Sequence, residues 1–255
     1  MTNEDVLATR LGNYTKLSEE ECHALRMLAR DRVRRVGARV DLVREGERPR
    51  SVFLILSGWA YRYKTMEDGR RQIVSFLLPG DLCDLNNFVL AEMDHTISAL
   101  TALQFVELPH ERVAQICEEF PRIGRALWWH MLSSISMQRQ WTVSLSRSAL
   151  ERIGHLFCEL FLRLQTVGLT RGNMCDLPPT QTELAEATGL TPVHVNRTLQ
   201  EMRAEGLIVL KDRILEIPDL ARLQHAVLFT PNYLHLGQAE AGTSVEKDVA
   251  PAVEI

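Results

Sequence analysis

The sequence predicts an α+β protein with an N-terminal antiparallel β-roll, one long helix and a C-terminal winged helix-turn-helix. Three observations carry this prediction. Short apolar runs between evenly spaced glycines indicate successive hairpins, a long apolar stripe after Pro121 indicates a helix, and two capped helices before a hairpin indicate the winged motif. The expected boundaries are a leader at 1–20, the roll at 21–118, the long helix at 119–146, the winged domain at 147–222 and an extension at 223–255 that ends in disorder.

Composition excludes several classes of protein. A hydrophobic content of 45% and a charged content of 24% are ordinary for a globular protein, and no apolar run is long enough to span a bilayer. With a polar, acidic start, this predicts a cytoplasmic protein without a membrane partner. The five cysteines form no C-x-x-C pair, so neither a disulfide framework nor a metal site is expected. No nucleophile–base pair or phosphate-binding glycine loop is visible, so the protein is not expected to be an enzyme.

The first half of the chain predicts one helix and then the roll. Ser18 and Glu21 have the spacing of a capping box, which predicts a short helix ending near Arg32. From about residue 38 to 108 the chain has runs rich in Val, Ile, Leu, Phe and Tyr, which predict strands. The glycines that separate these runs recur every 11 or 12 residues and are expected at tight bends. They are Gly46, Gly58, Gly69 and Gly80.

Phe120-Pro121 begins a long helix that is expected to reach about Ser144. Apolar side chains recur along it at intervals of three and four residues. A stripe of this length between two domains would be exposed in a monomer, which favours a dimer seam over the alternative that the stripe packs on its own roll. The predicted seam residues are Leu127, Trp128, Met131, Leu132 and Ile135.

The winged domain begins with an amphipathic helix at about 148–164, on which two further helices pack. Thr180 and Glu183 form a T-x-x-E capping box for the first of these two. Gly189 allows the sharp turn that follows, because glycine reaches positive φ without a clash. Thr191 then caps the second helix, with Pro192 at its first position.

The second helix has the pattern of a recognition helix. Val195, Leu199 and Met202 form its buried stripe, which leaves the opposite face free to enter a major groove. Arg197 can donate two hydrogen bonds to a guanine. Strands at 207–210 and 214–217 form the wing, whose cations are expected to touch phosphate. The predicted DNA contacts are Thr191, Val193, His194, Asn196, Arg197, Gln200, Lys211 and Arg213.

The net charge of the chain does not by itself indicate DNA binding. The net charge is −4, and residues 147–213 carry eight Lys or Arg against eight Asp or Glu. DNA affinity must therefore come from where the cations lie and not from a basic field over the whole domain.

The order of these parts resembles the Crp/Fnr superfamily of bacterial transcription regulators. The segments G-E at 46–47, L-S-G at 56–58, D-G-R at 68–70 and P-G-D-L at 79–82 are similar to that family's cyclic-nucleotide-binding-like roll. TELAEATGLTPVHVNR is similar to its helix-turn-helix, and the resemblance spans about residues 25–217. It implies a homodimer that binds a palindromic double-stranded DNA site, with RNA polymerase as a further partner.

The resemblance also identifies an effector pocket. In members that bind cyclic AMP, a Gly-Glu after P-G-D accepts the ribose hydroxyl, and a later Arg-Ser or Arg-Thr grips the phosphate. Asp84-Leu85 and His95-Thr96 stand at these positions here. Without the arginine the phosphate loses its bidentate partner, so cyclic AMP is not expected in the usual mode. The predicted effector pocket comprises Cys83, Asp84, Leu85, His95 and Thr96.

No cofactor is predicted. The iron–sulfur members of the family need several cysteines near the N-terminus, where this chain has only Cys22. Haem on His95, His130 or Cys83 finds no support in ligand spacing. Cys83 is a candidate redox sensor, with a buried apolar thiol as the alternative.

Two questions stay open at this point. Family members commonly carry a glutamate where Val193 stands; valine is suited to a thymine methyl, so the DNA half-site is expected to differ from the family's usual ones. The alternative function is a ligand-binding regulatory subunit whose C-terminal domain binds protein. A regulatory subunit of this kind is expected to have a complete set of phosphate-binding residues, which this chain lacks.

Overall fold

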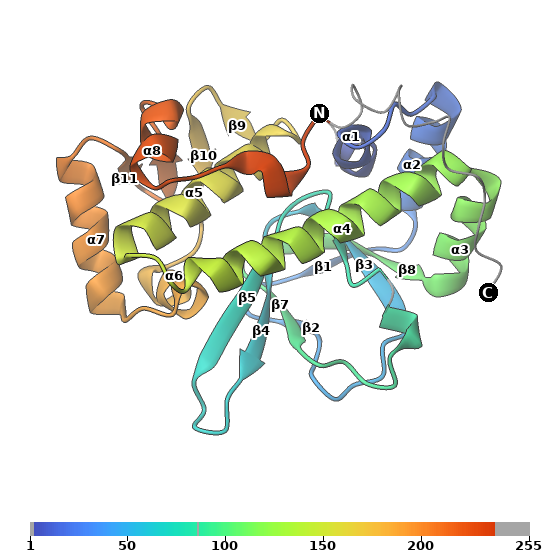
Figure 1. Ribbon diagram of the computed structural model, residues 1–255. Coiled ribbons are helices and arrows are strands. Elements are labelled where there is room, and N and C mark those ends of the chain that lie inside the picture. The colour runs from blue at the N-terminus through green and yellow to red at the C-terminus, as the bar shows by residue number, and fades with distance from the viewer. Residues whose placement is uncertain (1–2, 86, 238–255) are drawn as a thin grey trace.

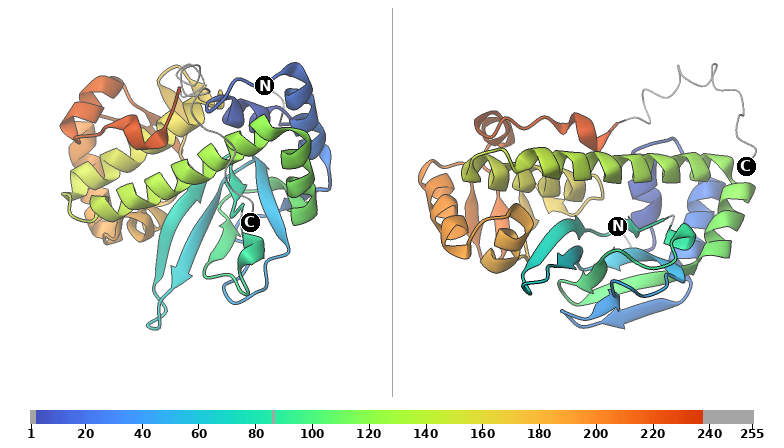
Figure 2. Two further views of the ribbon diagram at one scale, coloured as in Figure 1. Left: turned by 45° about the vertical axis from the view of Figure 1, so that its right-hand side comes forward. Right: turned by 60° about the horizontal axis from the view of Figure 1, so that its bottom comes forward.

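The computed structural model describes residues 3–85 and 87–237. The described chain forms a β-roll, a C-terminal domain of helices with its own small sheet, and a long helix, α4 (Pro121–Ser144), that runs past both (Figure 1). The further views also show α4 lying along the roll and reaching the C-terminal helices (Figure 2). The α+β order predicted from the sequence is confirmed.

The elements other than α4 are short. The remaining helices are α1 (Val6–Gly12), α2 (Glu19–Arg30), α3 (His110–Glu119), α5 (Ala149–Gln165), α6 (Gln181–Thr188), α7 (Pro192–Ala204) and α8 (Leu220–Ala226), with 3-10 turns η1 (Asn87–Val89) and η2 (Pro231–Leu234). The strands are β1 (Val33–Val36), β2 (Asp41–Val43), β3 (Ser51–Ser57), β4 (Ala60–Thr65), β5 (Arg71–Leu77), β6 (Leu82–Cys83), β7 (Thr96–Ala99), β8 (Leu103–Pro109), β9 (Thr170–Arg171), β10 (Met174–Asp176), β11 (Val209–Lys211) and β12 (Ile214–Glu216).

The roll consists of two antiparallel four-stranded sheets, in the orders β1-β8-β3-β6 and β2-β7-β4-β5. All four glycines of the predicted rhythm have positive φ, as tight bends require. Two of them also meet neighbours closely. A Cβ at Gly58 would lie 2.2 Å from the Ala102 carbonyl oxygen, and one at Gly80 would lie 2.9 Å from the Val6 carbonyl oxygen. These glycines therefore allow backbone segments to approach each other.

The predicted helix starts are confirmed. Ser18 accepts a hydrogen bond from the Glu21 backbone N–H, and the Glu21 carboxylate accepts one from the Ser18 N–H. Thr180 and Glu183 form the same reciprocal pair at α6. Gly189 ends α6 in the left-handed conformation, with φ of 66°. These local caps satisfy backbone groups that a helix end leaves free.

Two segments near the limits of the described chain have structure that the sequence analysis did not identify. The leader expected at 1–20 contains α1, whose Val6, Leu7 and Leu11 are buried against the roll. The extension expected after residue 222 continues through α8 to η2, where Tyr233 and Leu234 join the core of the C-terminal domain. Disorder at the end of this extension stays a prediction, because residues 238–255 lie outside the described range.

The prediction also missed α3, which was assigned to the roll, and it misplaced one face of α4. Leu127 was expected at the dimer seam but is only 4% exposed, because it packs with Val106 and Leu108 of the roll. The alternative that α4 packs on its own roll is thus correct for this face of the helix. A helical stripe identifies apolar residues, but it does not tell which neighbour covers each of them.

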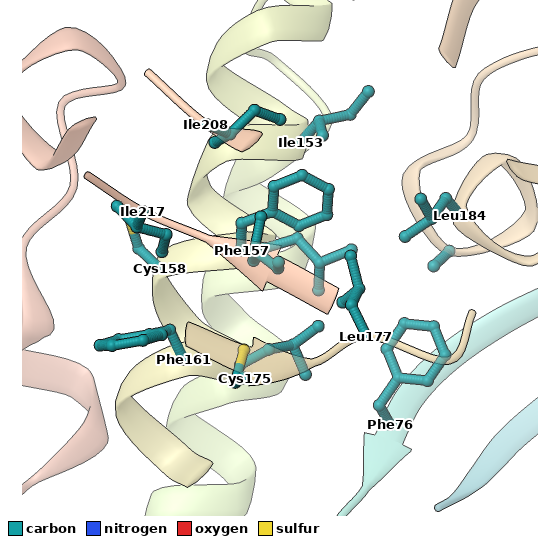
Figure 3. Close-up of a cluster of buried hydrophobic side chains, with 14 of the residues drawn as sticks. Phe76, Ile153, Phe157, Cys158, Phe161, Cys175, Leu177, Leu184, Ile208 and Ile217 are labelled. Carbon is teal, nitrogen blue, oxygen red and sulfur yellow. The ribbon is translucent and has the colours of Figure 1, made fainter. Parts of the chain in front are cut away.

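The roll and the C-terminal domain share one hydrophobic core. Phe76 of β5 lies beside Leu177 in the cluster that also contains Phe157 of α5 (Figure 3). Its ring also makes an edge contact with Trp141 of α4, with centroids 6.1 Å apart. The base helix α5 of the winged domain is therefore packed directly against the roll at this place.

Phe157→Ala is expected to lower the free energy of unfolding by about 3–5 kcal/mol, because the side chain is fully buried and its loss leaves a cavity. Urea denaturation followed by circular dichroism measures this change. Met66→Ala is the control, since Met66 is 42% exposed and should cost less than about 0.5 kcal/mol. Equal losses in the two variants would contradict the shared core.

Candidate DNA-binding surface and effector cavity

The recognition helix α7 separates its two faces as predicted. Val195, Leu199 and Met202 are at most 1% exposed, whereas Val193 is 81% exposed. The buried residues pack on α5 and α6, so the opposite face lies free on the surface. That face carries the predicted contacts Thr191, Val193, His194, Asn196, Arg197 and Gln200, which are all exposed. The structure thus brings six of the eight predicted DNA contacts to one surface.

Two of these side chains are already engaged. The Thr191 hydroxyl accepts a hydrogen bond from the His194 N–H at 3.2 Å, so it caps α7. Gln181, at the start of α6, donates its amide N–H to Asn196 Oδ1 at 3.3 Å. Sequence reasoning missed Gln181. Gln181 holds Asn196 in place beside Arg197. Its place at the first residue of α6 is the sequence feature from which this contact could have been predicted.

The wing is the hairpin β11–β12, and it supplies the other two predicted contacts. Asp212 and Arg213 at its tip both have positive φ, 51° and 61°, as a two-residue hairpin turn requires. Lys211 and Arg213 are exposed. Arg213 also lines a hollow between the wing and the Gly58 and Thr101 loops of the roll. The two wing cations thus have different surroundings: Arg213 lines the hollow beside the roll, whereas Lys211 does not.

The helix-turn-helix is tied to the end of α4 by Arg152 of α5. One guanidinium nitrogen donates to the Thr188 carbonyl of α6 at 2.7 Å. The other donates to the carbonyls of Leu145 and Arg147, at 2.9 and 3.0 Å. A cation at two helix C-termini also opposes their partial negative charge. Sequence reasoning missed this clamp, because the three carbonyls meet only in the fold.

A second tie joins α6 to the roll. Arg71 of β5 forms an ion pair with Glu186 at 2.9 Å, and Gln72 donates to the Glu186 backbone carbonyl at 2.6 Å. The Arg71 guanidinium lies over the rings of Tyr61 and Tyr63, 5.8 and 5.3 Å from their centroids. These contacts use the side of α6 away from α7, so they leave the exposed face of α7 uncovered.

A cavity of about 520 Å³ lies between the roll and α4. Strands β4 and β5, the segment 81–95 and the α4 residues 130–138 form its wall. Asp84, Leu85 and His95 line it, as predicted. Cys83 and Thr96 do not: the Cys83 side chain points into the apolar core of the roll, and the Thr96 hydroxyl accepts the Glu45 N–H at 3.0 Å. Alternation along a strand turns such neighbours to opposite sides.

Burial also overturns the redox assignment of Cys83. The thiol is fully buried, and burial raises its pKa well above the usual range of a cysteine. A thiolate is the reactive form, so this thiol is inert. In the part of the chain that the structure describes, no group of three or more His, Cys, Asp or Glu residues could hold a metal ion.

The cations of the cavity are paired with carboxylates. Arg62 lies 3.2 Å from Asp84, and His95 lies 3.0 Å from the same carboxylate. Lys64 lies 2.9 Å from Glu45. Burial would raise the pKa of Asp84, but Arg62 and His95 outweigh it and lower that pKa to about 2. Sequence reasoning missed Arg62, whose only signal was its place on a strand next to the predicted pocket.

Two buried polar atoms of the cavity wall have no hydrogen-bond partner among the described residues. They are Oδ1 of Asn87 and Nδ1 of His130, on side chains that are 4% and 5% exposed. Burial lowers the pKa of His130 to about 4, so its ring is neutral near pH 7. Such atoms cost free energy unless a partner reaches them.

The exposed side of α4 carries most of the predicted seam. Trp128, Leu132 and Ile135 are 62%, 45% and 44% exposed, and Met131 is partly buried between this face and the cavity. With Leu127 turned inward, these four residues form the apolar α4 face. Large exposed apolar side chains in one row are typical of a protein–protein interface.

The comparisons with known proteins agree with this architecture. Residues 33–120 match the cyclic nucleotide-binding domain family, and residues 151–226 match the Crp-like helix-turn-helix domain family. Over 183 residues the chain is 30% identical to the transcriptional activator protein FnrL of Cereibacter sphaeroides, covering 70% of this chain and 73% of that protein. The chain belongs to the Crp/Fnr family.

Other Crp/Fnr relatives support the same assignment. The nitrogen fixation regulation protein FixK of Bradyrhizobium diazoefficiens is 31% identical over 183 residues, which cover 68% of this chain and 73% of that protein. The structure of FixK2 from Bradyrhizobium japonicum has the same fold, with a TM-score of 0.66 at 21% identity over 76% of this chain and 95% of that chain. The protein is therefore a DNA-binding transcription regulator and not an enzyme. This favours DNA binding over the regulatory-subunit alternative.

The cavity differs from the phosphate-binding pocket that the family resemblance implies. His95-Thr96, the pair that the resemblance places at the phosphate-gripping position, has its polar atoms on Asp84, Asp94 and the Glu45 backbone. A cyclic phosphate would thus find these groups occupied. Separately, none of the helices among residues 3–85 and 87–237 is long and apolar enough to cross a membrane.

Asp84→Asn is expected to lower the free energy of unfolding by about 2 kcal/mol at pH 7, and the difference should shrink as the pH falls from about 4 towards 2. The folded-state pKa lies below the ordinary 3.8, so the carboxylate stabilises the fold above that value and loses this effect as it is protonated. Urea denaturation at a series of pH values measures the difference.

Asp176→Asn is the matched control, because the Asp176 side chain is 69% exposed and its ion pair among the described residues is with exposed Arg171. It should change stability little at every pH. A loss in Asp84→Asn that stayed constant from pH 7 to pH 2 would show that the ion pairs of Asp84 do not cause it.

Proposed function

We propose that this protein is a homodimer that reads a two-fold symmetric DNA site with α7, and that the cavity of its roll binds an effector other than cyclic AMP in the usual mode. The observation that carries the proposal is the exposed face of α7, held on a packed base and left uncovered by the roll. A helix presented in this way enters a major groove with its first turns.

The chemistry of that face supports sequence-specific reading. Arg197 can donate two hydrogen bonds to guanine O6 and N7, and Val193 can contact a thymine methyl group. His194 and Gln200 lie on the same face, while Lys211 in the wing suits a phosphate. Since the domain has no excess of basic residues, these few placed groups supply both affinity and specificity.

The apolar α4 face supports the dimer. Two copies that pack through this face bring their DNA-binding domains to one side of the pair, about one helical turn apart on the duplex. A transcriptional activator also contacts RNA polymerase at a promoter, and the proposal includes this contact. The proposed location of the protein is the bacterial cytoplasm, where the chromosome lies.

The cavity supports effector binding because its volume of about 520 Å³ has room for a small molecule and its wall combines polar and apolar side chains. Its cations are already paired, which disfavours an anionic phosphate as the main anchor. We propose no resident metal, haem or iron–sulfur cluster. An effector there favours one of two arrangements of the DNA-binding domains.

The test of the proposal is selection of the purified protein against random duplex DNA at near-physiological salt, followed by sequencing of the bound pool. A two-fold symmetric motif is the expected result, with half-sites that reflect Val193 and Arg197. Binding without any enriched motif would overturn sequence-specific reading.

Arg197→Ala should weaken binding to the selected site by about 1–3 kcal/mol and leave binding to random DNA nearly unchanged, because it removes a base contact. Fluorescence anisotropy on both duplexes measures the two affinities. Arg203→Ala is the matched control, an exposed arginine at the far end of the same helix, and should change both affinities little. An equal loss on both duplexes would exclude base reading by Arg197.

Leu132→Asp should convert the dimer to a monomer, because it places a charge in the apolar α4 face. Sedimentation equilibrium measures the mass, and the affinity for the palindrome should fall with it. Met66→Asp changes an exposed apolar residue of the β4–β5 hairpin and serves as control. A Leu132→Asp protein that remained a dimer would place the seam elsewhere.

A further inference from the structure

One residue of the DNA-binding domain lies in the wall of the effector cavity. Arg163 of α5 is 4% exposed and lines the cavity together with Asp81 and His130. Its guanidinium donates to Asp81 Oδ2 at 2.6 Å and to the Phe76 carbonyl at 3.0 Å, both in the roll. A second nitrogen lies 3.4 Å from Glu159, one turn earlier on α5. The Arg163 side chain therefore connects the DNA-binding domain with the roll.

Asp81 is held from several sides. Besides Arg163, it accepts the Leu78 backbone N–H at 2.8 Å and lies 3.4 Å from Arg10 of α1. Arg10 in turn donates to the Arg163 carbonyl at 3.0 Å, near the end of α5. Burial would raise the pKa of Asp81, but the two arginines lower it to about 2, so the ion pair stays charged near neutral pH.

Glu159 extends the same network to two more segments. It accepts hydrogen bonds from the indole N–H of Trp141 on α4 at 3.2 Å and from the Tyr233 hydroxyl in η2 at 3.0 Å. Its side chain is 2% exposed. One buried polar network thus joins α1, the roll, α4, α5 and η2, and each member has a defined partner.

Such a network fixes orientation more than it adds stability. A guanidinium fork that spans two domains in a dry site allows few relative angles between them, whereas an apolar contact tolerates sliding. The Arg71–Glu186 pair is more exposed, with side chains at 36% and 19%, and constrains less. The angle of α5, and with it the direction of α7, therefore depends on Arg163.

We propose that Arg163 and Asp81 are positioning residues that set the spacing between the two DNA half-sites. The inference rests on the proposed function, a dimer that reads a two-fold symmetric site. Inserting one base pair between half-sites turns one of them by about 34° and moves it by about 3.4 Å. A dimer with rigidly held domains cannot follow this change, whereas a dimer with loosened domains can.

The experiment compares three duplexes: the selected palindrome, and the same site with one base pair inserted or removed at its centre. The wild-type dimer should prefer the original spacing by about tenfold or more, and Arg163→Met should reduce that preference to about threefold or less. Arg163→Lys, which keeps the charge, should restore part of it. Affinity for the original site should change less than the preference does.

Arg171→Met is the matched control, because Arg171 belongs to the same domain but pairs with Asp176 within it. It should keep the wild-type preference. Circular dichroism and sedimentation confirm that each variant is a folded dimer. If Arg163→Met does not fold, Asp81→Asn, which keeps the size of the side chain, replaces it with the same expected result.

The possible outcomes distinguish a failure of the proposed function from a failure of the inference about Arg163 and Asp81. Failure of the selection to yield a symmetric site would overturn the proposed function and this inference with it. A symmetric site read equally well at all three spacings by the wild type would overturn the inference alone. So would an Arg163→Met dimer that loses affinity for all three duplexes by one factor, since that is the signature of a merely structural role.

Discussion

The carboxylate of Asp81 is the point on which the rest of the structure depends. It sits beside Gly80 on the loop that leaves β5, and arginines from α1 and α5 converge on it. Each of these buried charges is satisfied only when its partners are in place, because a buried charge without a partner is costly. The network therefore favours one arrangement of the N-terminal helix, the roll and the DNA-binding domain.

This network explains why α1 and η2 both pack against the DNA-binding domain. Arg10 of α1 reaches the end of α5, and Tyr233 of η2 reaches Glu159 in the middle of the same helix. Both segments act as straps on the base of the DNA-binding domain. Arg152 makes a third connection at the other end of α5, where it joins the ends of α4 and α6. The exposed face of α7 remains outside all of these contacts.

The cavity shows how a family pocket can change its chemistry while the fold stays the same. The resemblance places Asp84 and His95 where cyclic-AMP-binding members of the family grip their ligand, and here Asp84 pairs with both His95 and Arg62. The charges are compensated within the protein, while Asn87 Oδ1 and His130 Nδ1 have no hydrogen-bond partner among the described residues. An occupant would lie next to Asp81 and Arg163, so the same pair connects the cavity with the DNA-binding domain.

The sequence by itself determined the features that depend on neighbours along the chain. Capping boxes, positive-φ glycines and the buried stripe of α7 are local, so the order of domains and the exposed face of α7 could be predicted. Only the tertiary structure decided which partner covers each surface. The inward turn of Leu127, the burial of Cys83, the strap formed by α1 and the pairing of Arg163 with Asp81 join residues distant in sequence. The chemistry of such pairs arises from packing, which periodicity does not encode.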